Sequence, residues 1–468
     1  MEGAILILKE LEKRGFKAYI VGGAVRDKLM GKIPQDVDIL TTAPPGVVEE
    51  IGKRSQWKVK GVGRAFGVSL LILDGKPYEV AAARKESYGL DSHRPEKVEY
   101  TSNIKQDLSR RDFTINSMAM DTKGRILDPF NGRDDLEKGI IRAVGDPQER
   151  FREDALRSFR AVRFAAQLGF DIEDRTLAAI KTCRDRIAGL SVERVRDELI
   201  KILISTHVSK GLGTLVDTGL AGCICRCTEN GVNREVGILP EILHLVDLPQ
   251  SPRYHTLDGF RHTLAVVQNT PPDITLRTAA LLHDIAKGLP GIRTRNKRGE
   301  LSDPGHHRLG AEMAEDIMKR LKFPQHIARR VVWLVYNHMS LPEPRKKTVI
   351  RWLRKRAPQF KSQDEFSEAI RQLLILFRAD IGGGMRDPDY SRLEESEVIM
   401  LDIIKTIPFY QEELHIKGER VAERLGAGPQ VGRFLNSLLE RIQSGQLSNT
   451  EKDLEDALDR KFYRSKIL

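Results

Sequence analysis

Hydrophobic and polar positions follow two different patterns along the 468 residues of the chain. Up to about residue 143, short apolar runs bounded by glycine and polar residues alternate with helical periodicity, which predicts strands and helices in turn. From Arg150 onward, apolar residues recur every three or four positions almost to Leu468, which predicts helices. The pattern therefore predicts an α+β fold, with a small mixed-sheet head followed by an all-α remainder.

Two apolar runs near the amino end, Ala18–Val21 and Val37–Leu40, predict strands. Between them, Gly22-Gly23 forms a turn that opens onto a helix carrying Arg26. A Gly-Gly turn lets the backbone approach a ligand closely, and the free N–H groups of a helix N-terminus favour phosphate. A lone Gly-Gly pair before a helix is usually only a tight turn.

Asp36 and Asp38 lie at the entry to the second of these strands. Because side chains two apart on a strand point to the same side, both carboxylates are expected on one sheet face. They would repel each other unless a cation sits between them, and hard oxygen ligands suit Mg²⁺. An isolated Asp-x-Asp is more often a solvated loop or a cap. The order strand, Gly-Gly, helix, Asp-x-Asp strand nevertheless predicts phosphoryl or nucleotidyl transfer.

A predicted hairpin supplies a third carboxylate. Val68–Leu73 and Pro77–Ala82 read as strands joined by Asp74-Gly75, and Glu79 falls in the second of them. If that strand lies beside the Asp-x-Asp strand, Glu79 completes a three-carboxylate site; otherwise it is a surface residue. Residues 84–100 are polar and without period, which predicts a mobile loop.

Composition narrows the classes of function. A formal charge of +11 suits a polyanionic partner such as RNA or DNA, although many basic proteins bind neither. No apolar run approaches ~18 residues, so no membrane span is expected. The amino end lacks the basic start of a secretory signal, so a cytoplasmic protein is expected. The four cysteines suit reduced, incidental thiols better than a metal or redox cluster: Cys183, Cys223, Cys225 and Cys227.

The residues Gly22–Gly31 and Asp36-Val37-Asp38 resemble the nucleotidyltransferase superfamily, and specifically the class II tRNA nucleotidyltransferases (CCA-adding enzymes) and bacterial poly(A) polymerases. The resemblance implies that Asp36, Asp38 and Glu79 are catalytic and that the two aspartates hold Mg²⁺. It also implies that Gly22, Gly23 and Arg26 hold the triphosphate of CTP or ATP. Arg94-Pro95 matches relatives that add the terminal adenosine.

A second family motif, Arg110-Arg111-Asp112-Phe113-Thr114-Ile115-Asn116, follows the predicted loop. An exposed, charge-paired helix start would have the same composition. The planar fork of an arginine binds phosphate oxygens in pairs and keeps its charge. By resemblance, Arg111 contacts the nucleotide, and Asp112 and Asn116 brace it.

The segment from Phe151 contains Glu-Asp-x-x-Arg, which resembles the base-selecting motif of the family. Asp154 and Arg157, three apart on a helix, would be neighbours on one face and offer acceptor and donor atoms to cytosine or adenine. An ordinary intrahelical salt bridge is the alternative. The resemblance adds Arg160 and Arg163, although helical geometry places Arg163 nearly opposite Asp154. The segment Ser191–Leu199 resembles a helix that packs under the site, and no chemistry is assigned to it.

A second constellation resembles the HD phosphohydrolase superfamily. Its six candidate metal ligands are His262, His283, Asp284, His306, His338 and Asp380. Imidazole and carboxylate together suit divalent Mn, Ni, Co or Fe, and one or two such ions would support hydrolysis of phosphate esters. His307 is an alternative to His306. The pattern also fits a remnant in which only the packing survives.

The sequence thus predicts four parts, 1–143 (head), 144–249 (neck), 250–390 (HD domain) and 391–468 (tail). The predicted function is addition or repair of the 3′-terminal CCA of tRNA with CTP and ATP. Alternatives are an enzyme that adds only CC or only A, a poly(A) polymerase, or mainly an HD phosphohydrolase with an inactive head. Oligomeric state is not readable. Two basic clusters suit the tRNA backbone or are solvated faces, namely Lys346, Lys347, Arg351, Arg354, Lys355 and Arg356, and Arg460, Lys461, Arg464 and Lys466.

Overall fold

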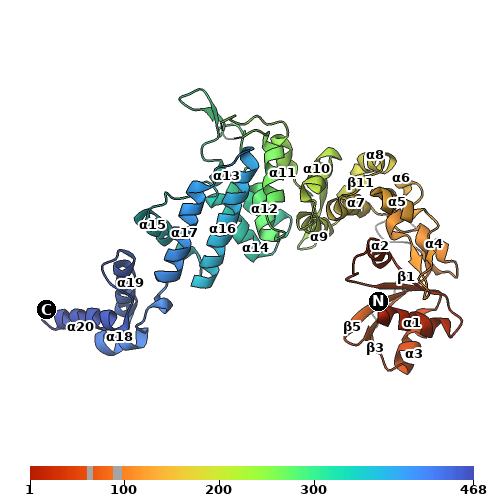
Figure 1. Ribbon diagram of the computed structural model, residues 1–468, viewed down its shortest axis with the longest axis horizontal. Coiled ribbons are helices and arrows are strands. Elements are labelled where there is room, and N and C mark those ends of the chain that lie inside the picture. Colours follow the sequence, from red (N-terminus) through yellow and green to blue (C-terminus); the bar gives the residue numbers. More distant parts are fainter. Residues whose placement is uncertain (61–66, 88–96, 254, 468) are drawn as a thin grey trace. The chain divides into compact units, whose positions relative to one another are not determined.

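The computed structural model describes residues 1–60, 67–87, 97–253 and 255–467 (Figure 1). The chain forms two compact units, Met1–Leu243 with Lys319–Phe323, and His244–Met318 with Pro324–Leu468. In the part of the chain described, no helix has the length and apolar character needed to cross a membrane. The four-part division expected from the sequence is finer than these two units and stays a prediction.

A seven-stranded mixed sheet forms the head, in the order β3-β4-β5-β2-β1-β8-β9. Its strands are β1 (Ala18–Val21), β2 (Asp38–Thr41), β3 (Lys58–Lys60), β4 (Val68–Leu73), β5 (Lys76–Ala82), β8 (Ala119–Met120) and β9 (Ile126–Leu127). Only β2 and β5 pair in parallel; the other neighbours are antiparallel. The predicted first strand, hairpin and α+β class are confirmed.

Five helices accompany the sheet: α1 (Glu2–Glu12), α2 (Gly23–Leu29), α3 (Pro45–Arg54), α4 (Ile104–Ser109) and α5 (Gly132–Lys138). The apolar stripe of α1 is buried through Ala4, Ile7, Leu8 and Leu11, which places this helix against the sheet. α3 packs on β3 and β4, and Figure 1 shows it on the same face as α1. This packing holds β1 and β2 in place, and both strands lead into the site.

The sequence predicts a loop over residues 84–100, but part of this segment forms two strands. β6 (Arg84–Ser87) and β7 (Lys97–Tyr100) form an antiparallel ladder, which supplies backbone hydrogen bonds that composition does not reveal. Residues 88–96, and with them Arg94-Pro95, lie outside the described residues.

The rest of the first unit is mainly helical: α6 (Pro147–Glu153), α7 (Leu156–Leu168), α8 (Asp174–Thr182), α9 (Val192–Leu203) and α10 (Val208–Asp217). Two small ladders interrupt it, β10 (Ile140–Ile141) with β11 (Asp171–Ile172), and β12 (Ile224–Glu229) with β13 (Val232–Gly237). The second ladder was not predicted, although Asn230-Gly231, both with positive φ, is a strong hairpin turn signal.

The β12–β13 hairpin explains the alternate spacing of Cys223, Cys225 and Cys227 (the cysteine triplet). Cys225 and Cys227 point inward from alternate positions of β12 and are buried, and all four cysteines are free. Burial raises the pKa of Cys225 to about 11, which keeps its thiol protonated at neutral pH. Cys225 and Cys227 therefore belong to the inward face of a strand, and the half-buried Cys223 precedes that strand.

The second unit is helical, with one small hairpin. Its helices are α11 (Gly259–Asn269), α12 (Ile274–Leu282), α13 (His306–Arg320), α14 (Gln325–Asn337), α15 (Lys346–Arg356), α16 (Gln363–Gly384), α17 (Ser391–Thr406), α18 (Gly418–Leu425), α19 (Pro429–Gln443) and α20 (Glu451–Ile467). The hairpin pairs β14 (Thr294–Arg295) with β15 (Leu301–Ser302). α16 packs against α11, α12 and α14, while α18, α19 and α20 share a separate apolar cluster (Figure 1).

Candidate functional sites

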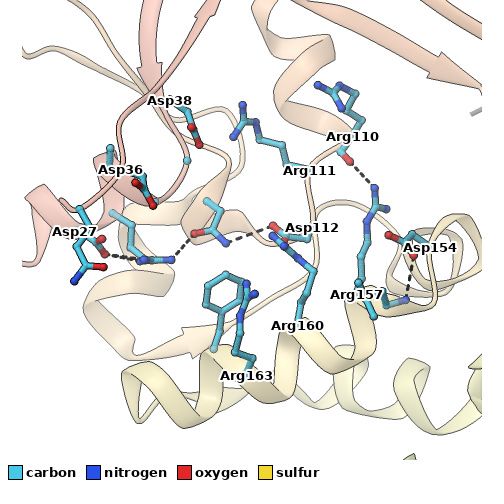
Figure 2. Close-up of a pocket in the computed structure, with 18 of the residues that line it drawn as sticks. Asp27, Asp36, Asp38, Arg110, Arg111, Asp112, Asp154, Arg157, Arg160 and Arg163 are labelled. Atoms are coloured by element: carbon cyan, nitrogen blue, oxygen red, sulfur yellow. Dashed lines mark hydrogen bonds and ion pairs between the residues drawn. The ribbon is translucent and has the colours of Figure 1, made fainter. Parts of the chain in front are cut away.

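One cavity of about 750 Å³ gathers most of the residues predicted for nucleotide binding (Figure 2). Its lining includes Gly22, Gly23, Arg26, Asp36, Asp38, Arg111, Asp154, Arg157, Arg160 and Arg163. These residues come from the β1–α2 turn, the start of β2, the segment after α4, and α7 with the turn before it. Segments more than a hundred residues apart therefore meet at one site.

Strand register places Asp38 beside Glu79, although Glu79 is not among the residues that line the cavity. Asp38 is paired with Val21 of β1 on one side and with Glu79 of β5 on the other. Asp36, however, lies in a bend before β2, so the predicted argument from strand alternation is wrong for this residue. The buried Val37 between two exposed aspartates still turns both toward the same cavity.

The electrostatics of Asp38 fit a divalent cation. Partial desolvation of the carboxylate in the cavity raises the pKa of Asp38, the negative charges of Glu79 and Asp36 raise it further, and the positive charge of Arg111 lowers it. A carboxylate held among other carboxylates is stabilised by a cation between them. The oxygen-only donor set of Asp36, Asp38 and Glu79 suits Mg²⁺.

The glycine turn lies against the same groups. Gly22 has φ +70°, and a Cβ on this residue would meet Nη1 of Arg111 at 3.1 Å and Oδ2 of Asp38 at 3.8 Å. A side chain here would strain the backbone and crowd the cavity. Burial lowers the pKa of Arg111, and the nearby carboxylate of Asp107 offsets this effect.

The resemblance implied that Asp112 and Asn116 brace Arg111, but both residues bind other arginines. Nε of Arg160 donates to Oδ2 of Asp112 at 2.7 Å, and Nη1 of Arg26 donates to Oδ1 of Asn116 at 2.9 Å. The two residues thus orient arginines from α7 and α2 around the cavity (Figure 2). Burial alone would raise the pKa of Asp112, but the charge and hydrogen bond of Arg160 lower it to about 2.

Asp154 and Arg157 do not share a helix face, which corrects another prediction. α6 ends at Glu153, α7 begins at Leu156, and Asp154 has extended backbone geometry between them. Its carboxylate accepts from the N–H of Leu156, the first residue of α7, at 3.1 Å, and its extended backbone ends α6. Both residues line the cavity nonetheless, from the turn and from the helix.

Each of these two side chains has its own partner. Nη2 of Arg194 in α9 lies 3.1 Å from Oδ2 of Asp154. Nη1 of Arg157 donates to Glu153 at 2.6 Å, and its Nη2 donates to the backbone oxygen of Arg110 at 2.8 Å. The partners fix the orientation of both side chains.

Arg160 and Arg163 both line the cavity. The expectation that Arg163 lies opposite Asp154 was wrong, because Asp154 is not part of α7. Nη1 of Arg163 donates to Glu198 of α9 at 3.0 Å, and its guanidinium lies 4.5 Å from the ring centre of Phe164. The helix expected to pack under the site thus supplies Arg194 and Glu198, whose i, i+4 spacing was the signal for a shared face.

The second candidate site lies in the second unit and collects all six predicted metal ligands. His262 comes from α11, His283 and Asp284 follow α12, His306 begins α13, His338 follows α14, and Asp380 lies in α16. The donor atoms of His262, His283 and Asp284 lie within 4.8 Å of one another, and so do those of Asp284, His306 and His338. Asp284 therefore faces both groups.

Distances at Asp284 show how the two groups are joined. Its Oδ2 lies 3.2 Å from Nε2 of His283, and its Oδ1 lies 3.2 Å from Nε2 of His306. Oδ1 of Asp380 lies 3.1 Å from Nε2 of His262. The set has the donors for one divalent ion, or for two that share Asp284.

Backbone carbonyls fix the tautomer of the four histidines. Nδ1 of His262, His283, His306 and His338 lies 2.6–3.0 Å from the carbonyl oxygen of Gly383, Ala280, Asp303 and Val335, respectively. Because a carbonyl only accepts, Nδ1 carries the hydrogen and Nε2 keeps its lone pair for a metal. His307 instead stacks edge-on against Tyr336, so His306 is the residue that joins the cluster.

Three known protein families match successive segments of the chain. The family "Poly A polymerase head domain" matches residues 18–142, "Probable RNA and SrmB- binding site of polymerase A" matches 169–226, and "HD domain" matches 255–380. The first match contains the carboxylates and Arg111, and the third contains all six histidine-site residues. Together with the geometry, these matches define a nucleotidyltransferase with an HD domain.

Similar proteins show to which nucleotidyltransferase family the chain belongs. The chain is 41% identical to the CCA-adding enzyme of Enterococcus faecalis over 297 residues, 62% of this chain and 70% of that protein. It is 45% identical to that of Lactobacillus helveticus over 218 residues, 47% of this chain and about half (54%) of that protein. The Bacillus stearothermophilus CCA-adding enzyme, solved in complex with CTP, has a TM-score of 0.67 and 27% identity, covering 100% of this chain and 99% of that one. The chain belongs to the family of CCA-adding enzymes.

The ion pair between Asp112 and Arg160 makes a testable contribution to stability. The difference between the ordinary pKa of 3.8 and about 2 corresponds to about 2 kcal/mol in favour of the folded state above pH 4. Because the folded pKa is lowered, this stability is lost as the pH falls from about 4 toward 2.

Urea unfolding of wild type and Asp112→Asn checks this contribution. The variant should be less stable by about 2 kcal/mol between pH 5 and 8, with the gap narrowing below pH 4. Glu50→Gln, which removes an exposed pairing with Arg54 in the same unit, should change stability by less than about 0.5 kcal/mol. A gap that stays constant down to pH 3 would contradict the assignment.

Proposed function

We propose that this chain adds or repairs the 3′-terminal CCA of tRNA, with CTP and ATP as substrates and Mg²⁺ as cofactor. The observation that carries the proposal is the single cavity in which Asp36 and Asp38 face Arg111 and the arginines of α7. Family membership supports the same function, and so does the likeness to an enzyme solved with CTP. A tRNA substrate agrees with the cytoplasmic location predicted from the sequence.

The 3′ oxygen of the tRNA bonds to the α-phosphorus of the nucleotide while the proton of the 3′-hydroxyl passes to solvent. The bond from that phosphorus to the α–β bridging oxygen breaks, and pyrophosphate leaves. Bound Mg²⁺ would activate the 3′-hydroxyl and neutralise the leaving pyrophosphate. Asp36, Asp38 and Glu79 would hold the ion. Arg111, Arg26 and the backbone at Gly22 would hold the triphosphate beside it.

Selection of the base falls to Asp154 and Arg157. A carboxylate and a guanidinium offer acceptor and donor atoms that match the exposed edges of cytosine and adenine but not uracil. Arg194 and Glu153 would hold the two side chains in position while the base is read. Arg160 and Arg163 would add positive charge along the same wall.

A second function is favoured by the histidine cluster. We propose that the HD domain hydrolyses phosphate esters with one or two divalent transition metals. The supporting observation is that four histidines, each fixed through Nδ1, direct Nε2 at Asp284 or Asp380. A packing remnant would not require this uniform orientation.

Contacts to the body of tRNA stay predictions. Five of the six basic residues of α15 are exposed, while Arg356 stacks on Trp352 at 3.7 Å and donates to Asn337. In the tail, Arg460 and Lys461 line a cavity with Arg433 and Arg441. The side chains of Arg464 and Lys466 lie outside the described residues.

Replacing a catalytic carboxylate tests the main proposal. Asp38→Ala and Asp36→Ala should each lower the rate of nucleotide incorporation at least about a thousandfold, because the metal and the developing charge lose their ligand. tRNAs lacking A, CA or CCA, incubated with CTP, ATP or both, report incorporation by product length. The same assay separates full CCA addition from CC-only, A-only and poly(A) products.

Glu50→Ala is the matched control, because it removes an exposed carboxylate of α3 in the same head. It should keep wild-type rates, and circular dichroism should show all three variants folded. Turnover retained by Asp38→Ala would refute the assigned role.

Arg157→Lys tests base selection, because lysine keeps the charge but loses the planar fork. The preference for CTP over UTP, measured as a ratio of kcat/KM, should fall about tenfold or more. Arg152→Lys, at an exposed position of α6, should leave the ratio within twofold. An unchanged ratio in Arg157→Lys would exclude a templating role.

A further inference from the structure

A small hairpin forms part of the wall around the histidine site. Residues 293–302 contain β14, β15 and the turn between them. Asn296, Leu301 and Ser302 line a cavity of about 770 Å³ whose lining also includes His306 and Asp380. Whatever enters this cavity therefore meets the hairpin.

The hairpin turn is held in one conformation by Asn296. Its Oδ1 accepts from the N–H groups of Arg298 and Glu300 at 2.9 and 3.0 Å, and its Nδ2 donates to the carboxylate of Glu300 at 2.9 Å. Gly299 supplies the positive φ of +78° that the turn requires. The positions of Lys297 and Arg298 at the tip are thus organised before any ligand binds.

The base of the hairpin is joined to the metal-ligand set. Arg293 donates to both carboxylate oxygens of Asp303, at 3.0 and 2.8 Å. The backbone oxygen of Asp303 accepts from Nδ1 of His306 at 2.6 Å. One residue therefore anchors the hairpin and orients a predicted metal ligand, which fixes the distance between the tip and the histidine site.

Positive charge predominates along the hairpin. Arg293 is neutralised by Asp303, and Glu300 is the single carboxylate in residues 293–302. Arg295, Lys297 and Arg298 are exposed, and the guanidinium of Arg295 donates only to the carbonyl oxygen of Gly299 among the bonds described for it. Three cations thus extend from the cavity wall into solvent on a rigid support.

We propose that residues 293–302 form a binding arm for single-stranded RNA whose phosphorylated end enters the histidine site. This inference rests on the proposed hydrolytic function of that site. Arg298 at the tip is four residues from Ser302 at the cavity, so the strand rise gives a reach of up to about 13 Å. A ligand with one phosphate cannot occupy both places, whereas a chain with a phosphate on every nucleotide can.

Kinetics on two substrates test the arm in the full-length protein. The arm variant is Arg295→Gln, Lys297→Gln and Arg298→Gln together, which leaves Asn296 and Gly299 intact. The matched control is Arg329→Gln, Lys361→Gln and Lys405→Gln, three exposed cations of the same unit that line none of the three cavities described. With Mn²⁺, release of phosphate is measured from a 3′-phosphorylated oligoribonucleotide and from the corresponding 3′-phosphorylated mononucleotide.

The arm variant should raise KM for the oligoribonucleotide about tenfold and leave KM for the mononucleotide within twofold. Loss of three phosphate contacts should also make the slope of log(1/KM) against log[salt] shallower by about 2 for the oligoribonucleotide. The control variant should match wild type on both substrates. An arm variant that matches the control, or that loses both substrates equally, would overturn the inference.

A readout without metal separates this inference from the hydrolytic function. An oligoribonucleotide with 4-thiouridine near its 3′ end is cross-linked by light to the metal-free protein, and the attached peptides are identified by mass spectrometry. The arm predicts adducts within residues 293–302 that the arm variant loses; absence of such adducts in wild type would overturn it. If wild type hydrolyses neither substrate, the hydrolytic function fails while the cross-link still decides on the arm.

Discussion

The proposed metal site of the head depends on the register between three strands, β1, β2 and β5. Asp38 is opposite Val21, the residue before the glycine turn, and opposite Glu79 on the other side. A slip of one residue in either pairing would turn a carboxylate to the other sheet face. Because β2 and β5 are parallel, this register is set by the packing of α1 and α3 on the sheet rather than by a tight turn. Charge repulsion among the carboxylates opposes that register, and a divalent cation bound between them would relieve it.

The arginines of the cavity are positioned by a different principle, because each has its own buried or half-buried acceptor. Arg160 is paired with Asp112, Arg163 with Glu198, and Arg157 with Glu153 and the carbonyl oxygen of Arg110. A guanidinium with several donors can keep one such anchor and still present other donors to a ligand. The result is a cationic wall whose geometry exists before a triphosphate arrives, so little side-chain ordering remains to be done on binding.

The local sequence pattern predicted some of these elements and contacts and missed others. The first strand, the β4–β5 hairpin and the position of Glu79 beside Asp38 follow from alternation, turn residues and the family resemblance. The break at Asp154 was missed because an Asp between two helices and an Asp within one helix have the same spacing to Arg157. The i, i+4 spacing of Arg194 and Glu198 places them on one face of α9, but only tertiary packing brings that face to the site. The β12–β13 hairpin could have been predicted, because Asn230-Gly231 is a typical hairpin turn. The helical pattern on either side led to its omission. In the HD domain, the ligand order was readable, but the carbonyl partners of Nδ1 depend on how each helix ends.

A crystal of the protein grown with Mn²⁺ and CTP tests the central claim most directly, through the anomalous scattering of the metal. The account predicts an anomalous peak between the carboxylates of Asp36 and Asp38, with the triphosphate beside Gly22 and Arg111 and the cytosine facing Asp154 and Arg157. A peak elsewhere in the first unit, or a nucleotide bound with its base away from α7, would contradict it.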